Sequence, residues 1–124
     1  MTGFVALIGG GVLGTVARYA FAGLVYRTCG TGFPWGTLAV NLTGCFLIGL
    51  FAALSEVKFA LGPSTRMFLM VGFCGAYTTF STLIFETANL VRDGQDILAL
   101  ANILTSVLVG FLVFRLGFFA GQLM

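Results

Sequence analysis

The sequence contains no histidine and very little charge. Without histidine, the chain holds neither a histidine-based proton relay nor a histidine-ligated zinc ion. Charged residues make up 8% of its 124 positions, whereas soluble domains carry about a quarter. A net charge of +2 without any basic run offers no surface for nucleic acid. This scarcity of charge excludes an ordinary soluble domain and indicates a protein of the lipid bilayer.

Cysteine is also scarce, and its placement excludes further classes. The three cysteines at 29, 45 and 74 are odd in number and lack the spacing of a disulfide framework or a thiolate metal site. With isolated acidic residues and no histidine, no nucleophile–base pair or metal-ligand cluster can be assembled. We therefore expect no enzymatic activity.

Long hydrophobic runs fill most of the chain, which is 59% hydrophobic. A bilayer span needs roughly 20 mostly apolar residues, and such runs occur at 4–26, 36–57, 66–91 and 97–123. The first run lacks a preceding basic region and is followed by three more, so it is interpreted as a span and not a cleaved signal. The sequence predicts an all-α integral membrane protein with four spans and a single transmembrane domain over residues 1–124.

The basic residues are divided evenly between the two ends of these spans. Lysine and arginine are enriched in cytoplasmic loops and so set orientation. One end collects Lys58, Arg66 and Arg115, and the other collects Arg18, Arg27 and Arg92. Equal numbers predict insertion in both orientations and an antiparallel dimer. The alternative is a fixed topology in which one or two of these arginines snorkel to the other side.

The first two predicted spans each carry a polar residue that needs an explanation, because polar groups in lipid are costly. Arg18 shares a helix face with Gly11 and Gly14. This face is interpreted either as a close helix contact with a snorkelling arginine or as part of a substrate site. Asn41 lies deep in the second span, on a face with Thr37, and either joins helices or donates hydrogen bonds to a permeating species.

The third predicted span contains the unusual stretch GFCGAYTTFSTL. Glycine weakens a helix by about 1 kcal/mol and threonine hydroxyls compete for its carbonyls, so we predict a break at 75–78. Backbone freed inside a bilayer must be buried or line a cavity, and its carbonyl oxygens are suitable ligands for a small cation. The alternative is a packed glycine kink whose hydroxyls bond back to the helix.

Beyond the predicted break, Thr79, Thr82 and Glu86 share one face of a helix. Phe80 and Leu83 form a neighbouring stripe, which is most often ordinary packing. A carboxylate such as that of Glu86 needs a partner, a proton or water inside a span.

The fourth predicted span carries a polar ladder of Asn102 and Ser106, with Gly110 one turn further on. Their groups, like those of Asn41, Ser81 and Thr82, are neutral hydrogen-bond donors. Such donors suit the replacement of the water shell of a small hard anion.

The segments GGGVLGTVARY, PWGTLAVNLTG and GFCGAYTTFST, the last followed by Glu86, resemble the Fluc (CrcB) fluoride channel family over most of the chain. The resemblance implies a passive, fluoride-selective channel that lets the ion leave the cytoplasm and prevents its toxic accumulation. It also implies a dual-topology homodimer of antiparallel subunits in the bacterial inner membrane, surrounded by lipid, with two fluoride pathways and a structural sodium ion at the dimer interface.

Site residues follow from the same resemblance. Backbone carbonyls of Gly75 and Thr78 match the family's sodium ligands. Fluoride in the family passes phenylalanine ring edges, which are positive; Phe80 matches the first of these, whereas Leu83 replaces the second and Ile84 a usual serine. The fluoride path is thus predicted to include Asn41, Phe80, Ser81, Thr82, Leu83, Asn102 and Ser106, and Arg18 and Glu86 match family charges.

Two other functions are compatible with four short spans. A small proton-coupled multidrug exporter would need a carboxylate facing a central cavity, and the acidic residues here lie at 56, 86, 93 and 96. In a non-transporting assembly subunit, the polar faces would only join helices.

Overall fold

The computed structural model describes residues 2–124, and within them every regular element is helical. Four helical runs are long and apolar enough to cross a membrane, which confirms the predicted all-α fold and its four spans. The first two are single helices, α1 (Thr2–Cys29) and α2 (Trp35–Glu56). The third consists of α3 (Pro63–Arg66), η1 (Met67–Cys74), α4 (Gly75–Tyr77) and α5 (Phe80–Arg92). The fourth consists of α6 (Asp96–Leu104), η2 (Thr105–Val109) and α7 (Gly110–Leu123).

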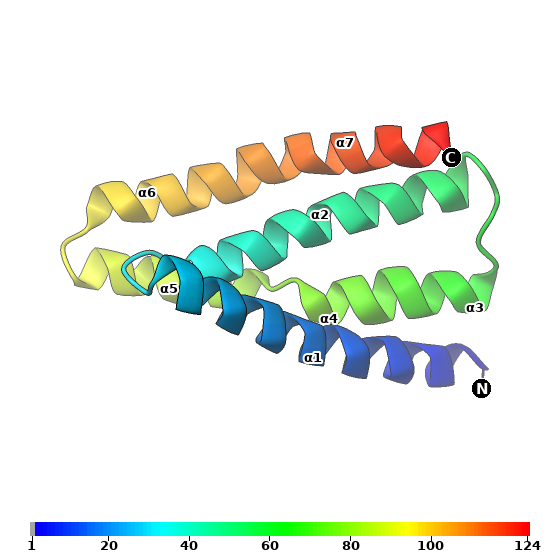
Figure 1. Ribbon diagram of the computed structural model, residues 1–124, viewed down its shortest axis with the longest axis horizontal. Coiled ribbons are helices and arrows are strands. Elements are labelled where there is room, and N and C mark those ends of the chain that lie inside the picture. The colour runs from blue at the N-terminus through cyan, green and yellow to red at the C-terminus, as the bar shows by residue number, and fades with distance from the viewer. Residues whose placement is uncertain (1) are drawn as a thin grey trace.

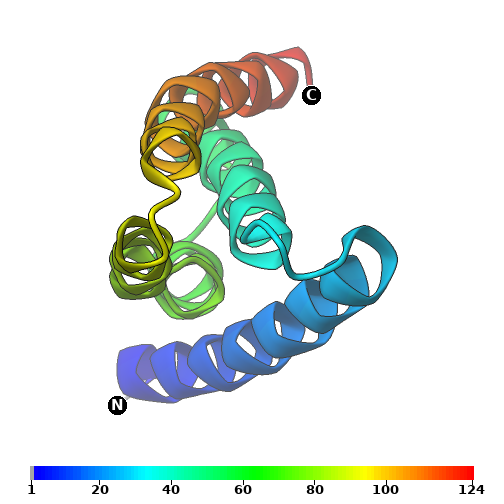
Figure 2. The ribbon, with the colours of Figure 1, turned by 90° about the vertical axis from the view of Figure 1, so that its left-hand side faces the viewer.

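Successive runs point in opposite directions along the bundle (Figure 1). Both termini and the 57–62 connection lie at one end, and the connections at 30–34 and 93–95 lie at the other. Figure 2 shows α2 between α1 and the fourth run, where it packs along α7, while α1 packs along η1. Lys58 and Arg66 thus lie by the connection at one end and Arg27 and Arg92 by the connections at the other, whereas Arg18 and Arg115 lie within α1 and α7.

Close packing between α2 and α7 depends on glycine. A Cβ added at Gly49 would overlap the Phe114 carbonyl oxygen, and one added at Gly117 would overlap the Phe46 carbonyl oxygen. Helices in lipid associate through small residues that let their backbones approach closely. The two helices are therefore in backbone contact at these two glycines.

A second glycine contact joins α1 to the third run. Gly14 lies against the Phe73 carbonyl and Gly10 against the Phe68 carbonyl. Gly11, which was expected to share this contact face with Gly14, has no atom within 4 Å of an added Cβ. The glycines that contact the third run, Gly10 and Gly14, are thus spaced i, i+4 and not i, i+3. This is the spacing of helix pairs whose i±4 ridges interdigitate.

The single chain leaves much apolar surface uncovered. Within residues 2–124, the large side chains that are completely buried are Val40 and Asn102, whereas Phe4, Val12 and Tyr19 on α1 are more than half exposed. A helix that is apolar on all sides belongs in a membrane or in a larger assembly.

Candidate functional site

Two extended residues separate α4 from α5, visible as a short non-helical link in Figure 1. Thr78 has φ −88° and ψ 160°, and Thr79 has φ −151° and ψ 120°. The Thr79 hydroxyl caps α5 by accepting the Thr82 N–H at 3.2 Å. Within the predicted interval 75–78, Gly75 is helical and only Thr78 is extended.

Asn41 on α2 binds the second of these residues at two points. Its Oδ1 accepts the Thr79 N–H at 2.8 Å, and its Nδ2 donates to the Thr79 carbonyl at 3.0 Å. Both polar groups of an extended residue are thereby satisfied without water. Of the two roles left open for Asn41, joining helices accounts for these bonds, and one N–H of its amide is left over.

The same bonds change the carbonyls of the preceding turn. In a continuous helix, the Gly75 carbonyl would accept from the Thr79 N–H, which here donates to Asn41. The Thr78 carbonyl would accept from the Thr82 N–H, which here donates to the Thr79 hydroxyl. Gly75 and Thr78 therefore each carry a carbonyl oxygen whose usual helical donor is directed elsewhere.

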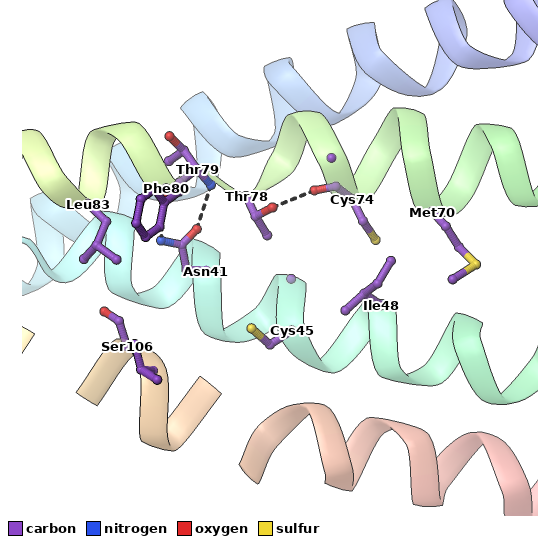
Figure 3. A pocket seen from close by; sticks show the side chains of 13 residues that line it. Asn41, Cys45, Ile48, Met70, Cys74, Thr78, Thr79, Phe80, Leu83 and Ser106 are labelled. Atoms are coloured by element: carbon purple, nitrogen blue, oxygen red, sulfur yellow. Dashed lines mark hydrogen bonds between the residues drawn. The ribbon is translucent and has the colours of Figure 1, made fainter. Parts of the chain in front are cut away.

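An open groove of about 380 Å³ lies between α2, the third run and η2 (Figure 3). We call it the open groove and define it by its lining, which is Asn41, Gly44, Cys45, Ile48, Met70, Cys74, Gly75, Thr78, Thr79, Phe80, Leu83, Ser106 and Val107. It brings together six of the predicted site residues, namely Asn41, Gly75, Thr78, Phe80, Leu83 and Ser106. Within residues 2–124, no group of three cysteine or carboxylate side chains is placed to hold a metal ion.

Phe80 and Leu83 contribute differently to the open groove. The Phe80 side chain is 74% exposed and Leu83 is 5% exposed, although both line it. Three residues advance a helix by about 300°, which is 60° short of a full turn. Leu83 therefore points about 60° away from Phe80, onto the side of α5 that packs against the other helices. Ser106 points from the fourth run toward Leu83 in Figure 3.

The Ser106 hydroxyl is unusual among the hydroxyls of these helices. Its oxygen is buried and has no hydrogen-bond partner within residues 2–124. Other hydroxyls donate to the carbonyl four residues earlier, as those of Thr15, Thr28, Thr43, Thr78 and Thr87 do. The Ser106 hydrogen is therefore available to a ligand.

A polar cleft of about 480 Å³ lies between α1, α2 and α5. Its lining is Thr15, Arg18, Tyr19, Ala22, Gly23, Tyr26, Thr37, Thr79, Thr82 and Glu86, and it unites the predicted residues Arg18, Thr82 and Glu86. Thr79, Thr82 and Glu86 share this cleft, as their helical spacing predicts.

Tyr26 is the partner that Glu86 requires, and the sequence analysis missed it. Its hydroxyl donates to Glu86 Oε2 at 2.9 Å and lies 3.4 Å from the Thr37 hydroxyl. Glu86 Oε1 is buried without a partner among the described residues. No spacing in the sequence relates residues 26 and 86, because they lie on different helices.

Two predicted residues lie outside both cavities. Ser81 is exposed, with its hydroxyl 3.5 Å from that of Thr79. Asn102 is 1% exposed, and its Nδ2 donates to the Thr87 hydroxyl at 2.9 Å.

Together these features define a four-span helical membrane protein whose polar groups gather around two extended residues. Over residues 5–118 the sequence matches the family described as "CrcB-like protein, Camphor Resistance (CrcB)", and the chain belongs to this family. It is 49% identical over 104 residues to a protein of Geobacter sp. strain M21, covering 84% of this chain and 82% of that one. A protein of Nitrosococcus oceani is 42% identical over 120 residues, covering 97% of this chain and 94% of that one. A protein of Solidesulfovibrio magneticus is 44% identical over 121 residues, covering 98% and 95% respectively. All three relatives are named "Fluoride-specific ion channel FluC".

Proposed function

We propose that the protein is a passive, fluoride-selective channel through which the ion leaves the cytoplasm. Family membership and the name shared by the three relatives support this proposal. The observation that carries it is the open groove, which is lined by both the unpaired Ser106 hydroxyl of the fourth run and the exposed Phe80 ring of the third. A small hard anion that loses water needs neutral donors and positive ring edges, and the lining of this groove offers both.

The pathway is proposed to lie between two chains. The Phe80 ring is 74% exposed, so a single chain supplies one wall of the open groove and leaves the ring uncovered. A second copy in antiparallel orientation would close the groove twice, once for each Phe80, and give two fluoride pathways. The equal division of basic residues supports dual topology, and the bacterial inner membrane is the proposed location.

The predicted site residues are distributed over both cavities. Asn41, Phe80, Leu83 and Ser106 line the open groove, and Thr82 lies in the polar cleft with Arg18 and Glu86. Ser81 and Asn102 stay as proposals, since neither lines a cavity of the single chain.

A structural sodium ion at the dimer axis is proposed to bind the Gly75 and Thr78 carbonyls of both chains. The support is chemical, since the usual helical donors of both oxygens are bonded elsewhere. Gly75 is exposed and has no atom within 4 Å of an added Cβ, so a partner chain could approach it closely.

One observation favours the alternative of a proton-coupled multidrug exporter. Glu86 lines the polar cleft, and such a pump requires a carboxylate in a cavity. Liposome flux separates the functions. Liposomes loaded with potassium fluoride and given valinomycin should release fluoride down its own gradient, without a pH gradient, and should retain chloride under the same conditions. Proton-driven exchange of an organic cation without fluoride efflux would support the exporter, and the absence of both would support an assembly subunit.

A further inference from the structure

Arg115 is a charged residue on the otherwise apolar α7. It lies about two helical turns before the last residue of that helix, Leu123, and its side chain is exposed. Its guanidinium has no hydrogen bond or ion pair recorded within residues 2–124, and three of the four acidic residues, at 86, 93 and 96, belong to the other half of the bundle. An arginine on a membrane-spanning helix needs an anion or water.

The length of the fourth run places Arg115 at the edge of the hydrocarbon. The run has 28 residues, Asp96–Leu123, and is therefore about 42 Å long, which matches the roughly 40–45 Å of a bilayer with its headgroups. Arg115 lies about 12 Å from the C-terminal end of the run. About half of that depth is headgroup layer, and the long side chain of arginine can reach across the remainder.

A hollow of about 350 Å³ lies beside this arginine on one face of α7. Its lining is Phe114, Arg115, Phe118, Phe119 and Gln122. The rings of Phe114 and Phe118 lie 6.3 Å apart between centroids, so the wall of the hollow is largely aromatic. Gln122 is exposed and nearer to the helix end. In Figure 1 and Figure 2, α7 lies at the edge of the bundle, where this hollow is open to lipid.

The half of the bundle that holds this hollow carries the net charge of the chain. Its basic residues are Lys58, Arg66 and Arg115, and its one acidic residue is Glu56. In the opposite half, three basic residues are matched by the three acidic residues at 86, 93 and 96, so the whole formal charge of +2 belongs to the half with the hollow. Anionic headgroups are attracted to such a basic end.

We infer that this hollow is a binding site for an anionic phospholipid. The lipid phosphate is bound by the Arg115 guanidinium, whose fork of donors matches phosphate oxygens, and by the Gln122 amide, a neutral donor at headgroup level. An acyl chain lies along the phenylalanine rings. Free phosphate offers the same oxygens but nothing for these rings to contact, so the lining favours the lipid. The site is separate from both cavities of the proposed fluoride path and does not depend on the channel function.

The test is a titration of the purified protein with phosphatidylglycerol in detergent, in which native mass spectrometry counts the bound lipid. Arg115→Gln should weaken the binding of phosphatidylglycerol about fivefold, the usual contribution of one basic residue near an anionic surface. Arg92→Gln is the matched control, because it makes the same chemical change in the half whose charges are balanced, and it should stay within about twofold. Arg115→Met replaces Arg115→Gln if the glutamine variant does not fold.

Two competitors identify the ligand. Millimolar inorganic phosphate should not displace phosphatidylglycerol, and phosphatidylcholine with the same acyl chains should bind more weakly. Displacement by inorganic phosphate would overturn the lipid site in favour of a free-anion site. Equal losses of binding in Arg115→Gln and Arg92→Gln would overturn it as well, because the attraction would then be general. If Arg115→Gln binds the lipid normally but no longer dimerises, a second copy of the chain covers this face and the inference fails.

Discussion

The two-point bond between Asn41 and Thr79 should hold the extended residues in place, and Asn41→Leu tests this. Leucine has the same branched side-chain skeleton as asparagine and is at home in lipid, so the change removes the two hydrogen bonds and keeps the side-chain shape. The backbone N–H and carbonyl of Thr79 would then lose their hydrogen-bond partners, because Thr79 is extended and Asn41 supplies both bonds.

The magnitude follows from these two backbone groups. A buried polar group left without its partner costs about 1–3 kcal/mol, and Thr79 is only partly shielded by α2. Two such groups give an expected destabilisation of about 2–5 kcal/mol. Because the extended link fixes the Gly75 and Thr78 carbonyls, fluoride efflux should fall as well.

Asn89→Leu is the matched control, because Asn89 has no side-chain hydrogen bond recorded within residues 2–124 and undergoes the same chemical change. Steric trapping in bicelles measures the free energy of unfolding of each variant, and an electrode measures fluoride efflux from liposomes. If both Asn→Leu variants unfold with equal free energies, the bond to Thr79 does not hold the link and the reasoning fails.

Four further outcomes are expected. Gly14→Ala should destabilise the fold by about 1–3 kcal/mol, because its Cβ overlaps the Phe73 carbonyl, whereas Gly11→Ala has open space and should not; equal unfolding free energies would contradict the packing. Gly75→Ala should leave the single chain folded but weaken dimerisation and flux, and a fully active dimer would argue against a sodium site there. Tyr26→Phe should cost about 1–3 kcal/mol of unfolding free energy, because it removes the hydrogen bond to Glu86. Thr37→Val should cost less, because the Thr37 hydroxyl lies 3.4 Å from that of Tyr26. A larger loss of unfolding free energy for Thr37→Val would be inconsistent with this pairing. Phe80→Ala should lower fluoride efflux severely without unfolding the chain. Phe85→Ala should retain fluoride efflux, because Phe85 is also exposed but lies outside the open groove. Equal effects of the two changes on efflux would place the fluoride path elsewhere.

The spans were predictable because length and apolar content suffice for that purpose. The third run was expected at 66–91 and is Pro63–Arg92, since Pro63 is tolerated in the first turn of a helix. Periodicity also placed Thr79, Thr82 and Glu86 on one face, and they share the polar cleft.

Contacts between residues on different helices could not be predicted from the sequence. The bond from Tyr26 to Glu86 joins residues 60 positions apart, and the bonds from Asn41 to Thr79 join residues 38 apart. A helical period fixes which residues share a face but not which face meets which neighbour. The contact role of Gly10 instead of Gly11 has the same cause, because the crossing of α1 over η1 decides it.

One hydrogen-bond arrangement prepares both kinds of proposed ion ligand. Because Asn41 takes the Thr79 N–H, the Gly75 carbonyl loses its donor, and because Thr79 caps α5, the Thr78 carbonyl loses its own. The capping hydroxyl of Thr79 also donates to the Thr82 hydroxyl at 3.0 Å, so the hydrogen of Thr82 is left for the polar cleft. Carbonyl oxygens for a cation and a hydroxyl hydrogen for an anion thus arise together, in the segment from Gly75 to Thr82 that contains the extended pair. A change at Asn41 should therefore disturb the proposed cation site and the proposed anion path at once, whereas a change at Ser106 should affect only the anion path.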